Sequence, residues 1–267
     1  MEPFRYISFG AGVQSTALLV MSAMQLDRYP CPKADVAIFA DTGDEPQWVY
    51  DSLGYYDQKF SDKIPIVVVR KPKTLSATMV AAAAGSRFAS IPCFTQSKDG
   101  SKGMLRRQCT REFKIDVIEP AVSKALKKLG RKKAAIAMLG ISVDEASRMK
   151  PNRTKWITNE WPLIDARMTR FDCVKFLQSL DLPVPMKSAC VFCPFHGDSY
   201  WLTLKNHYPK EFEKACAVDD TIRDMSKAGA TDPLFVHRSL TPLRIAKFRH
   251  EDQRDFFENE CEGHCGV

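Results

Sequence analysis

One stretch near the start of the chain constrains its fold most, the residues 6–19 with the sequence YISFGAGVQSTALL. A short apolar segment leads into two glycines and a Ser-Thr pair, and a second apolar run follows. This order predicts a β-strand, a tight turn and the first turn of a helix. Gly10 and Gly12 allow a ligand to approach the backbone, and a helix N-terminus favours an anion. The stretch is either a phosphate-binding loop or, equally, a glycine turn without a ligand.

Apolar runs and helical patterns alternate beyond this stretch. Strands are expected at 36–40, 64–69 and 134–139. Helices are expected at 48–60, 74–84 and 171–180, and a further helix is expected to end at about 129. The alternation predicts an α/β fold with a doubly wound, mostly parallel sheet. The polar, glycine-containing segment 95–103 is expected to be a mobile loop.

The character of the chain changes after Pro185. A cysteine-containing turn, helices rich in lysine and aromatic residues, and a tail with two cysteines follow. We therefore expect a first domain over residues 1–185, which carries the glycine stretch, and a helical, cysteine-containing segment over 186–267.

Composition narrows the class of protein. The 267 residues are 45% hydrophobic and 27% charged, which excludes a disordered chain. No apolar run approaches the roughly 20 residues that span a bilayer, and the start lacks the apolar segment of a signal peptide. We expect a cytoplasmic protein without membrane contact. A net charge of +7 permits a nucleic-acid or phosphorylated partner without requiring one.

Polar segments follow two of the predicted strands. Asp41-Thr42-Gly43 comes after the strand at 36–40, and Gly140-Ile141-Ser142 comes after the strand at 134–139. Parallel strands end at one edge of a sheet, where ligands bind, so both segments are expected beside the glycine stretch. The Asp41 carboxylate is suited to a ribose, an adenine or hydrated Mg²⁺, although turns and helix caps also use such a residue. The expected nucleotide-binding residues are Gly10, Ala11, Gly12, Gln14, Ser15, Thr16, Asp41, Thr42, Gly43, Gly140 and Ile141.

The cysteines form the second group of candidate functional residues. The nine cysteines are an odd number in a long chain, which favours reduced thiols or metal ligands over a disulfide framework. Cys190 and Cys193 form a C-x-x-C pair followed by proline, a spacing that lets two thiolates reach one metal or cluster. A zinc site that includes His196 and a thioredoxin-like redox pair are the alternatives.

These segments together resemble the PP-loop adenine-nucleotide α-hydrolase superfamily, and within it the phosphoadenosine-phosphosulfate reductase-like family. The loop of that family reads Ser-Gly-Gly-x-Asp-Ser-Thr, and residues 10–16 occupy the same frame. Gly10 stands in place of the Ser and Gln14 in place of the Asp, and a neutral Gln cannot help to bind a cation as Asp does. Asp41-Thr42-Gly43 matches the family's Asp-Thr-Gly, and residues 139–148 resemble its later Gly-x-x-x-x-Glu/Gln-Ser-x-Arg segment.

The resemblance also assigns roles to cysteines. Adenylylsulfate reductases join a Cys-Cys pair to a later C-x-x-C to hold a [4Fe–4S] cluster. Cys109 and Lys114 match the first segment, with Gln108 replacing one cysteine, and Cys190 and Cys193 match the second. A set of three cysteine ligands resembles that of iron–sulfur tRNA thiolases, in which the iron without a protein ligand carries sulfur. Alternatively, Cys93 is the fourth ligand.

The C-terminal tail resembles the Glu-Cys-Gly-x-His tail of the reductases, with an inserted Glu262. Cys261 and Cys265 are therefore candidate nucleophiles or persulfide carriers, and a frayed terminus is the alternative. Basic residues cluster around Cys109 and after the segment at 140–142. We expect them to meet the phosphates of a substrate: Arg106, Arg107, Arg111, Lys114 and Arg148.

The resemblance implies an ATP-dependent sulfurtransferase with a [4Fe–4S] cluster that adenylylates and thiolates a nucleic acid, either tRNA or DNA. It would use ATP with Mg²⁺ and a sulfur donor, and a homodimer is a further expectation. The alternative is an adenylylsulfate or phosphoadenylylsulfate reductase that uses a C-terminal cysteine and a thiol reductant. A second alternative is a non-catalytic nucleotide- or nucleic-acid-binding module held together by Zn²⁺.

Overall fold

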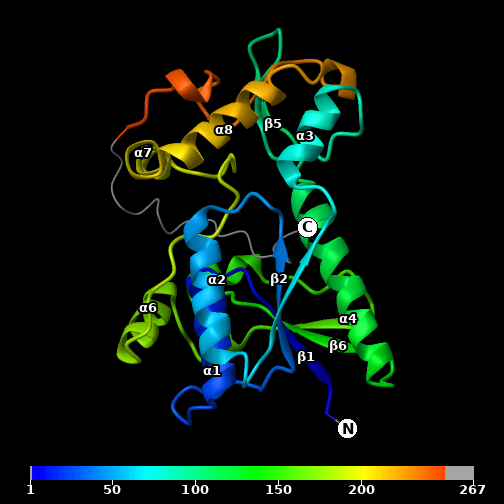
Figure 1. Cartoon of the computed structure of the whole chain (residues 1–267), viewed down its shortest axis with the longest axis vertical. Coiled ribbons are helices and arrows are strands. Elements are labelled where there is room, and N and C mark those ends of the chain that lie inside the picture. Colours follow the sequence, from blue (N-terminus) through cyan, green and yellow to red (C-terminus); the bar gives the residue numbers. More distant parts are fainter. Residues whose placement is uncertain (1, 250–267) are drawn as a thin grey trace.

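A five-stranded parallel sheet forms the centre of the structure, a computed structural model that describes residues 2–249 (Figure 1). The order β3-β2-β1-β6-β7 reverses direction between β1 and β6, so the chain winds outward on both sides of β1. Every neighbouring pair is parallel, which confirms the predicted doubly wound α/β fold. The strands are β1 (Phe4–Ser8), β2 (Val36–Asp41), β3 (Ile66–Arg70), β6 (Ala135–Met138) and β7 (Ile157–Glu160).

Helices cover both faces of this sheet (Figure 1). On one side lie α1 (Val13–Met24), α2 (Gln47–Phe60), α5 (Pro162–Asp165) and α6 (Arg170–Ser179), and on the other lies α4 (Asp116–Lys128). Successive side chains of a strand point to opposite faces. Ile7 accordingly packs into the core beneath α1, whereas Tyr6 packs into the core beneath α4.

A second, smaller part lies beyond the carboxyl ends of the strands. It contains the antiparallel sheet β5-β4-β8 and the helices α3 (Leu75–Ala83), α7 (Asp198–His207) and α8 (Pro209–Ile222). Its core joins residues 75–113 to residues 191–243, so segments from both sides of Pro185 pack together. The division of the chain at residue 185 stays a prediction.

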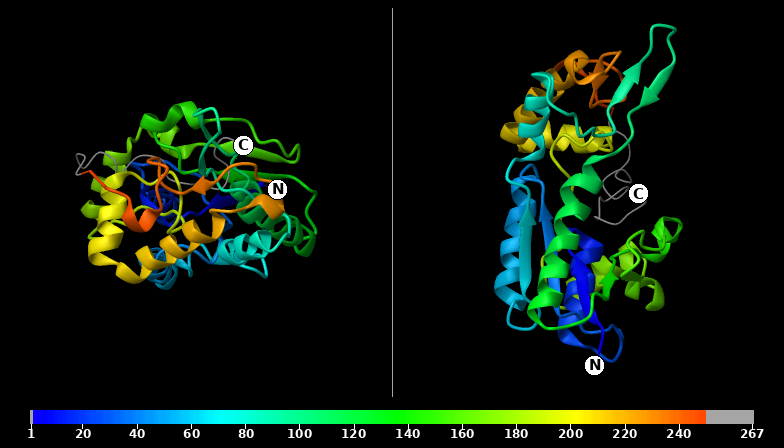
Figure 2. Two further views of the ribbon diagram at one scale, coloured as in Figure 1. Left: turned by 90° about the horizontal axis from the view of Figure 1, so that it is seen from above. Right: turned by 90° about the vertical axis from the view of Figure 1, so that its right-hand side faces the viewer.

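The segment 95–103 differs from the expected mobile loop, because it forms most of a hairpin. β4 (Phe94–Gln96) pairs with β5 (Lys102–Met104), and β4 also pairs with β8 (Leu234–Phe235). Gly100 has a φ of 86° in the turn between the strands, a conformation that glycine adopts readily. Figure 2 shows the hairpin extending away from the rest of the molecule.

The described residues also form short helices of the π and 3₁₀ types. The π-helix η1 (Arg111–Ile115) leads directly into α4, and the 3₁₀-helix η2 (Val143–Arg148) follows β6. Two further 3₁₀-helices, η3 (Ser226–Ala228) and η4 (Leu243–Ile245), lie near the end of the described residues. None of the helices within residues 2–249 is long and apolar enough to cross a membrane.

Candidate functional site

The glycine loop lies at the point where the strand order reverses. Ala11 has a φ of 57°, a left-handed conformation that costs a non-glycine residue roughly 1 kcal/mol. The Ser15 hydroxyl accepts the N–H of Gly10 (3.3 Å) and donates to the carbonyl of Gly12 (3.3 Å), which fixes the loop. The Thr16 hydroxyl is buried and has no hydrogen-bond partner among the described residues. A helix N-terminus at such a crevice suits an anionic ligand.

Gln14 holds the glycine loop to the segment after β6. Its amide oxygen accepts a hydrogen bond from the Arg170 guanidinium (2.6 Å), and its amide nitrogen donates to Glu145 (3.1 Å) and Ser142 (3.4 Å). Glu145 in turn pairs with Arg148. Both ends of the Gln14 amide are thus engaged by protein groups, so this residue does not fit the role of a Mg²⁺ ligand. Arg170 was missed by sequence reasoning because its partner is 156 residues away.

Asp41-Thr42-Gly43 forms a tight turn at the end of β2. The Asp41 carboxylate accepts the N–H of Gly43 (2.7 Å) and the hydroxyl of Tyr50 (2.9 Å). Gly43 has a φ of 75°, and a Cβ there would lie 2.4 Å from a Thr74 methyl carbon, so only glycine fits. A cavity of about 370 Å³ opens beside this turn, within the size range of small-ligand sites. Its lining also includes Arg70 and Lys71 from the end of β3.

Gly140 and Ile141 follow β6 and were predicted to bind the nucleotide. Gly140 and Ile141 are both buried, and the Ile141 side chain packs into the core beneath α4. Gly140 and Ile141 can therefore contact a ligand only through their backbone, whereas Ser142 and Glu145 contact the glycine loop through their side chains.

Three of the predicted cysteine ligands line one small pocket of about 30 Å³, which we call the cysteine pocket. Cys109 enters it just before η1, and Cys190 and Cys193 enter it from the C-x-x-C turn. Cys93 is fully buried and is not among the lining residues. Burial, and then the nearby Asp219, Cys109 and Cys193, raise the pKa of the Cys93 thiol.

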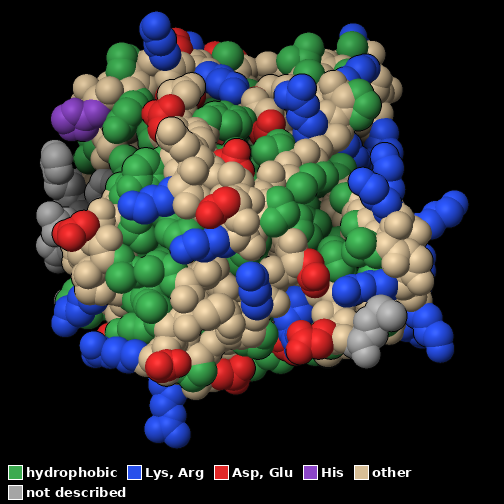
Figure 3. Space-filling view, turned by 60° about the horizontal axis from the view of Figure 1, so that its bottom comes forward, with side chains coloured by type: hydrophobic (Ala, Val, Ile, Leu, Met, Phe, Trp, Pro, Cys, Tyr) green, Lys and Arg blue, Asp and Glu red, His purple; other side chains and the backbone are tan. Residues whose placement is uncertain are grey.

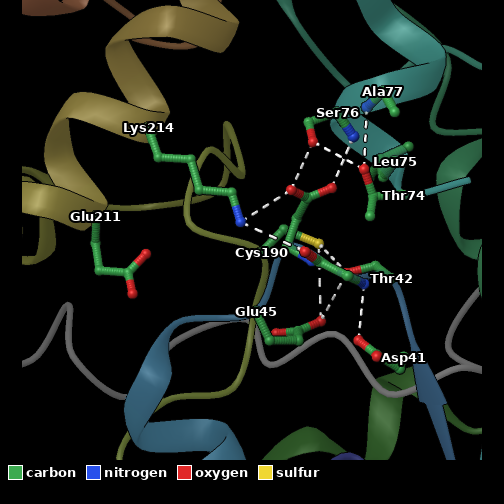
Figure 4. A network of polar contacts seen from close by, with 12 residues as sticks. Asp41, Thr42, Glu45, Thr74, Leu75, Ser76, Ala77, Cys190, Glu211 and Lys214 are labelled. Carbon is green, nitrogen blue, oxygen red and sulfur yellow. Dashed lines mark hydrogen bonds and ion pairs between the residues drawn. The ribbon is translucent and has the colours of Figure 1, made fainter.

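The Cys190 thiol lies against the Asp-Thr-Gly turn (Figure 4). Its Sγ is 3.2 Å from the Thr42 hydroxyl and 3.7 Å from the Glu45 carboxylate. Burial is the main cause that raises the pKa of both Cys190 and Glu45, and Lys114 opposes it at both groups. A thiolate in such surroundings needs positive charge nearby, which a bound metal centre supplies.

Cys109, Cys190 and Cys193 are the possible metal donors of the cysteine pocket. Across residues 2–249 no group of three or more His, Cys, Asp or Glu side chains is arranged to hold one metal ion. A zinc ion needs four donor atoms, each within about 2.3 Å of the metal. A four-iron cluster binds each thiolate to a different iron, so its cysteine sulfurs lie further apart. His196 donates a hydrogen bond from Nε2 to the Cys190 carbonyl (2.8 Å), and its ring stacks on Tyr200. It thereby supports the turn that carries both cysteines.

Asp44, which sequence reasoning also missed, joins this turn to the second part of the molecule. Its buried carboxylate accepts the backbone N–H and the hydroxyl of Ser76, both at 2.7 Å, and lies 3.0 Å from the Lys214 ammonium. Its carbonyl accepts the N–H of Val191 in the C-x-x-C turn (2.9 Å). Figure 4 shows Ser76 and Lys214 approaching from α3 and α8.

The basic residues predicted to contact phosphates lie at several different positions in the structure. Arg107 and Lys114 line the cysteine pocket. Arg148 pairs with Glu145, which accepts a hydrogen bond from Gln14 of the glycine loop. Arg106 is exposed near the base of the hairpin. Arg111 pairs with Asp116 and lines a separate pocket. Two predicted residues lie outside the described part of the chain: Cys261 and Cys265.

Comparison with known proteins adds a distant likeness. No family model matches the chain, and no curated protein matches it. Among solved structures, the chain is similar to the phosphoadenylyl-sulfate (PAPS) reductase of Candida auris in its phosphate complex. The two share 13% identity over 69% of this chain and 76% of that chain, with a TM-score of 0.41. The α/β fold described above follows from the chain's own strand order and is independent of this likeness.

Proposed function

We propose that the protein is an ATP-dependent sulfurtransferase that carries a [4Fe–4S] cluster and thiolates a nucleic acid. One observation carries the proposal. Thr42 lines both the 370 Å³ cavity and the cysteine pocket, and its hydroxyl contacts Cys190 at 3.2 Å. A nucleotide in that cavity and sulfur at the cysteines would therefore be neighbours, as ATP-driven sulfur transfer requires.

The nucleotide would bind across the edge of the sheet. The N–H groups at the start of α1 and the Arg170 guanidinium suit its phosphates, and the cavity beside Asp41 suits its nucleoside. Mg²⁺ prefers oxygen ligands and keeps several waters. Asp41 would be its protein ligand, because Gln14 is engaged by Arg170 and Glu145.

The cluster would be held by Cys109, Cys190 and Cys193, because Cys93 does not line the cysteine pocket. Bound through three thiolates, it supplies an iron position that can accept sulfur. Arg107 and Lys114 line the same pocket and would attract the phosphates of the substrate.

The reaction has two steps. A carbonyl oxygen of the substrate attacks the α-phosphorus of ATP, and the bond to pyrophosphate breaks. Sulfide-equivalent sulfur from a donor then attacks the activated carbon, and AMP leaves with the oxygen. Adenylylation turns a poor leaving group into a good one, which explains the need for ATP.

Anaerobic purification tests the proposal. Brown protein that contains iron and acid-labile sulfide, and that releases pyrophosphate from ATP only when RNA or DNA acceptor is present, is expected. Cys109→Ser should lose iron, whereas Cys31→Ser should keep it, because Cys31 lies in the core beneath α1, far along the chain from the cysteine pocket. Colourless protein with stoichiometric zinc refutes the proposal.

A reductase acting on adenylylsulfate or phosphoadenylylsulfate is the second candidate. The engagement of Gln14 by Arg170 favours it, because such a ligand binds without pyrophosphate cleavage and has less need of Mg²⁺ at the loop. Sulfite release with a thiol reductant, lost in Cys261→Ser or Cys265→Ser, would support the reductase. Pyrophosphate release without any sulfite would exclude it.

A further inference from the structure

A second small pocket lies on the other side of η1 from the cysteine pocket. It has a volume of about 30 Å³, and its lining includes Arg111 and Ile115 from η1. Lys150 and Arg153 line it from the loop before β7. Lys114 of the same helix lines the cysteine pocket, so one turn of π-helix separates the two.

Two cations of this pocket lack acidic partners. Neither Lys150 nor Arg153 forms an ion pair with any residue in the described range, whereas surface arginines elsewhere do so, as Arg87 does with Glu112 and Arg244 with Glu213. Figure 3 shows Lys and Arg scattered among Asp and Glu over one face of the molecule, so positive charge alone does not mark a site. What distinguishes this pocket is that two of its three cations, Lys150 and Arg153, line a concave surface and form no ion pair among residues 2–249.

The one acidic side chain in the lining is already engaged. The Glu119 carboxylate accepts a hydrogen bond from the Thr154 hydroxyl at 2.6 Å. Arg111 uses its Nε for Asp116 at 2.9 Å, which orients the guanidinium. With three cationic side chains and one carboxylate, the lining keeps a net positive charge.

Amide side chains hold the loop that carries Lys150 and Arg153. Asn152 donates to the Asn159 side chain (2.9 Å) and accepts the backbone N–H of Thr154 (2.8 Å). Asn159, in β7, donates to the carbonyl of Lys150 (2.9 Å). These bonds fix the backbone of the loop without using either cation, so the pocket is preorganised for an anion.

We propose that this pocket binds a phosphodiester group of the nucleic-acid substrate, an inference that rests on the proposed function. Because η1 separates it from the cysteine pocket, a strand whose phosphate is held by Lys150 and Arg153 would have a neighbouring nucleotide near Cys109. The pocket would thus position the strand, with the reacting base beside the cysteine pocket.

Binding of a labelled single-stranded RNA of about 12 nucleotides, followed by fluorescence anisotropy without ATP over a series of salt concentrations, tests this inference. The double variant Lys150→Ala/Arg153→Ala should bind roughly tenfold more weakly at moderate salt. The slope of log affinity against log salt should fall in magnitude by about 0.7, the value for one phosphate contact to a single strand.

The matched control removes the same charge from another surface. Lys127→Ala/Lys128→Ala changes two exposed lysines in the last turn of α4 and should leave the slope unchanged. Equal losses in both double variants, or none in either, would overturn the inference, as would a wild-type protein that does not bind the RNA at low salt.

A second arm separates a nucleic acid from a small nucleotide as the source of the phosphate. Calorimetric titration compares adenosine 3′,5′-bisphosphate with adenosine 5′-monophosphate. Loss of bisphosphate binding in Lys150→Ala/Arg153→Ala, with RNA binding intact, would overturn the nucleic-acid assignment. Iron and sulfide are measured in the same preparations: their absence from the wild type refutes the sulfurtransferase, whereas the binding result still decides the pocket.

Discussion

Replacing Asp44 by alanine should destabilise the protein strongly, because this carboxylate joins the turn after β2 to α3 and α8. It is fully buried and accepts two hydrogen bonds from Ser76, both at 2.7 Å, besides the contact to Lys214 at 3.0 Å. The Ser76 N–H belongs to the first turn of α3, where backbone donors have no partner within the helix.

The size of the effect follows from these contacts. Loss of an acceptor at a helix start costs about 0.5–2 kcal/mol, and a buried donor left without a partner costs about 1–3 kcal/mol. The Lys214 side chain is 38% exposed, so water screens its ion pair and its loss adds less than about 1 kcal/mol. We expect Asp44→Ala to lower the free energy of unfolding by roughly 3 kcal/mol, and Lys214→Ala by less than about 1 kcal/mol.

Urea unfolding followed by circular dichroism measures both values. The control is Asp51→Ala, which removes an exposed carboxylate that accepts one hydrogen bond from Gln47 on α2. It should cost less than about 0.5 kcal/mol. If Asp44→Ala costs no more than Asp51→Ala, the buried carboxylate does not hold the two parts together, and our account of the junction is wrong.

Three further outcomes are expected. Arg170→Met should weaken binding of adenosine 5′-monophosphate roughly tenfold by calorimetry, because it removes a charged donor beside the glycine loop; unchanged affinity would remove Arg170 from the site. Hydrogen bonds from Arg87 lower the pKa of Glu112, so their stabilisation is complete above the unfolded-state pKa of about 4.3 and is lost as pH falls through the folded-state value. In urea titrations, Glu112→Gln should therefore differ most from wild type at neutral pH, and a larger difference in acid would contradict this. Burial raises the pKa of Cys31 to about 12 and that of Cys216 to about 11, so mass spectrometry should find both unmodified by iodoacetamide in folded protein from which iron has been removed. Two half-buried thiols of the cysteine pocket should react in that protein and be protected when the proposed cluster is bound: Cys109 and Cys193.

The sheet was largely predictable because a strand buried on both faces is a continuous apolar run. β2 reads VAIFAD, and its end fixed the position of Asp41. β7 was missed because Thr158 and Asn159 interrupt its apolar character at the sheet edge. The hairpin β4–β5 was taken for a mobile loop because its polar residues and Gly100 are equally typical of loops, and its pairing with β8 lies far along the chain.

The site was predictable only where its residues follow strands or form a local motif. The glycine loop and the C-x-x-C pair are local, and Cys109 was added by resemblance. Arg170 and Asp44 carry no such signal, because their partners Gln14 and Ser76 lie 156 and 32 residues away. Contacts of that kind depend on the folded chain, and no pattern of spacing in the sequence encodes them.

The π-helical turn η1 makes both pockets depend on the length of the chain between Cys109 and α4. A π-turn contains one residue more than an α-turn, and each residue of an α-helix advances the side chain by about 100°. Deleting one residue from Arg111–Ile115 would restore α-helical winding and turn Cys109 away from Cys190, although every remaining residue would keep its chemistry. Among natural variants of this chain, substitutions on this turn should therefore be found more often than insertions or deletions.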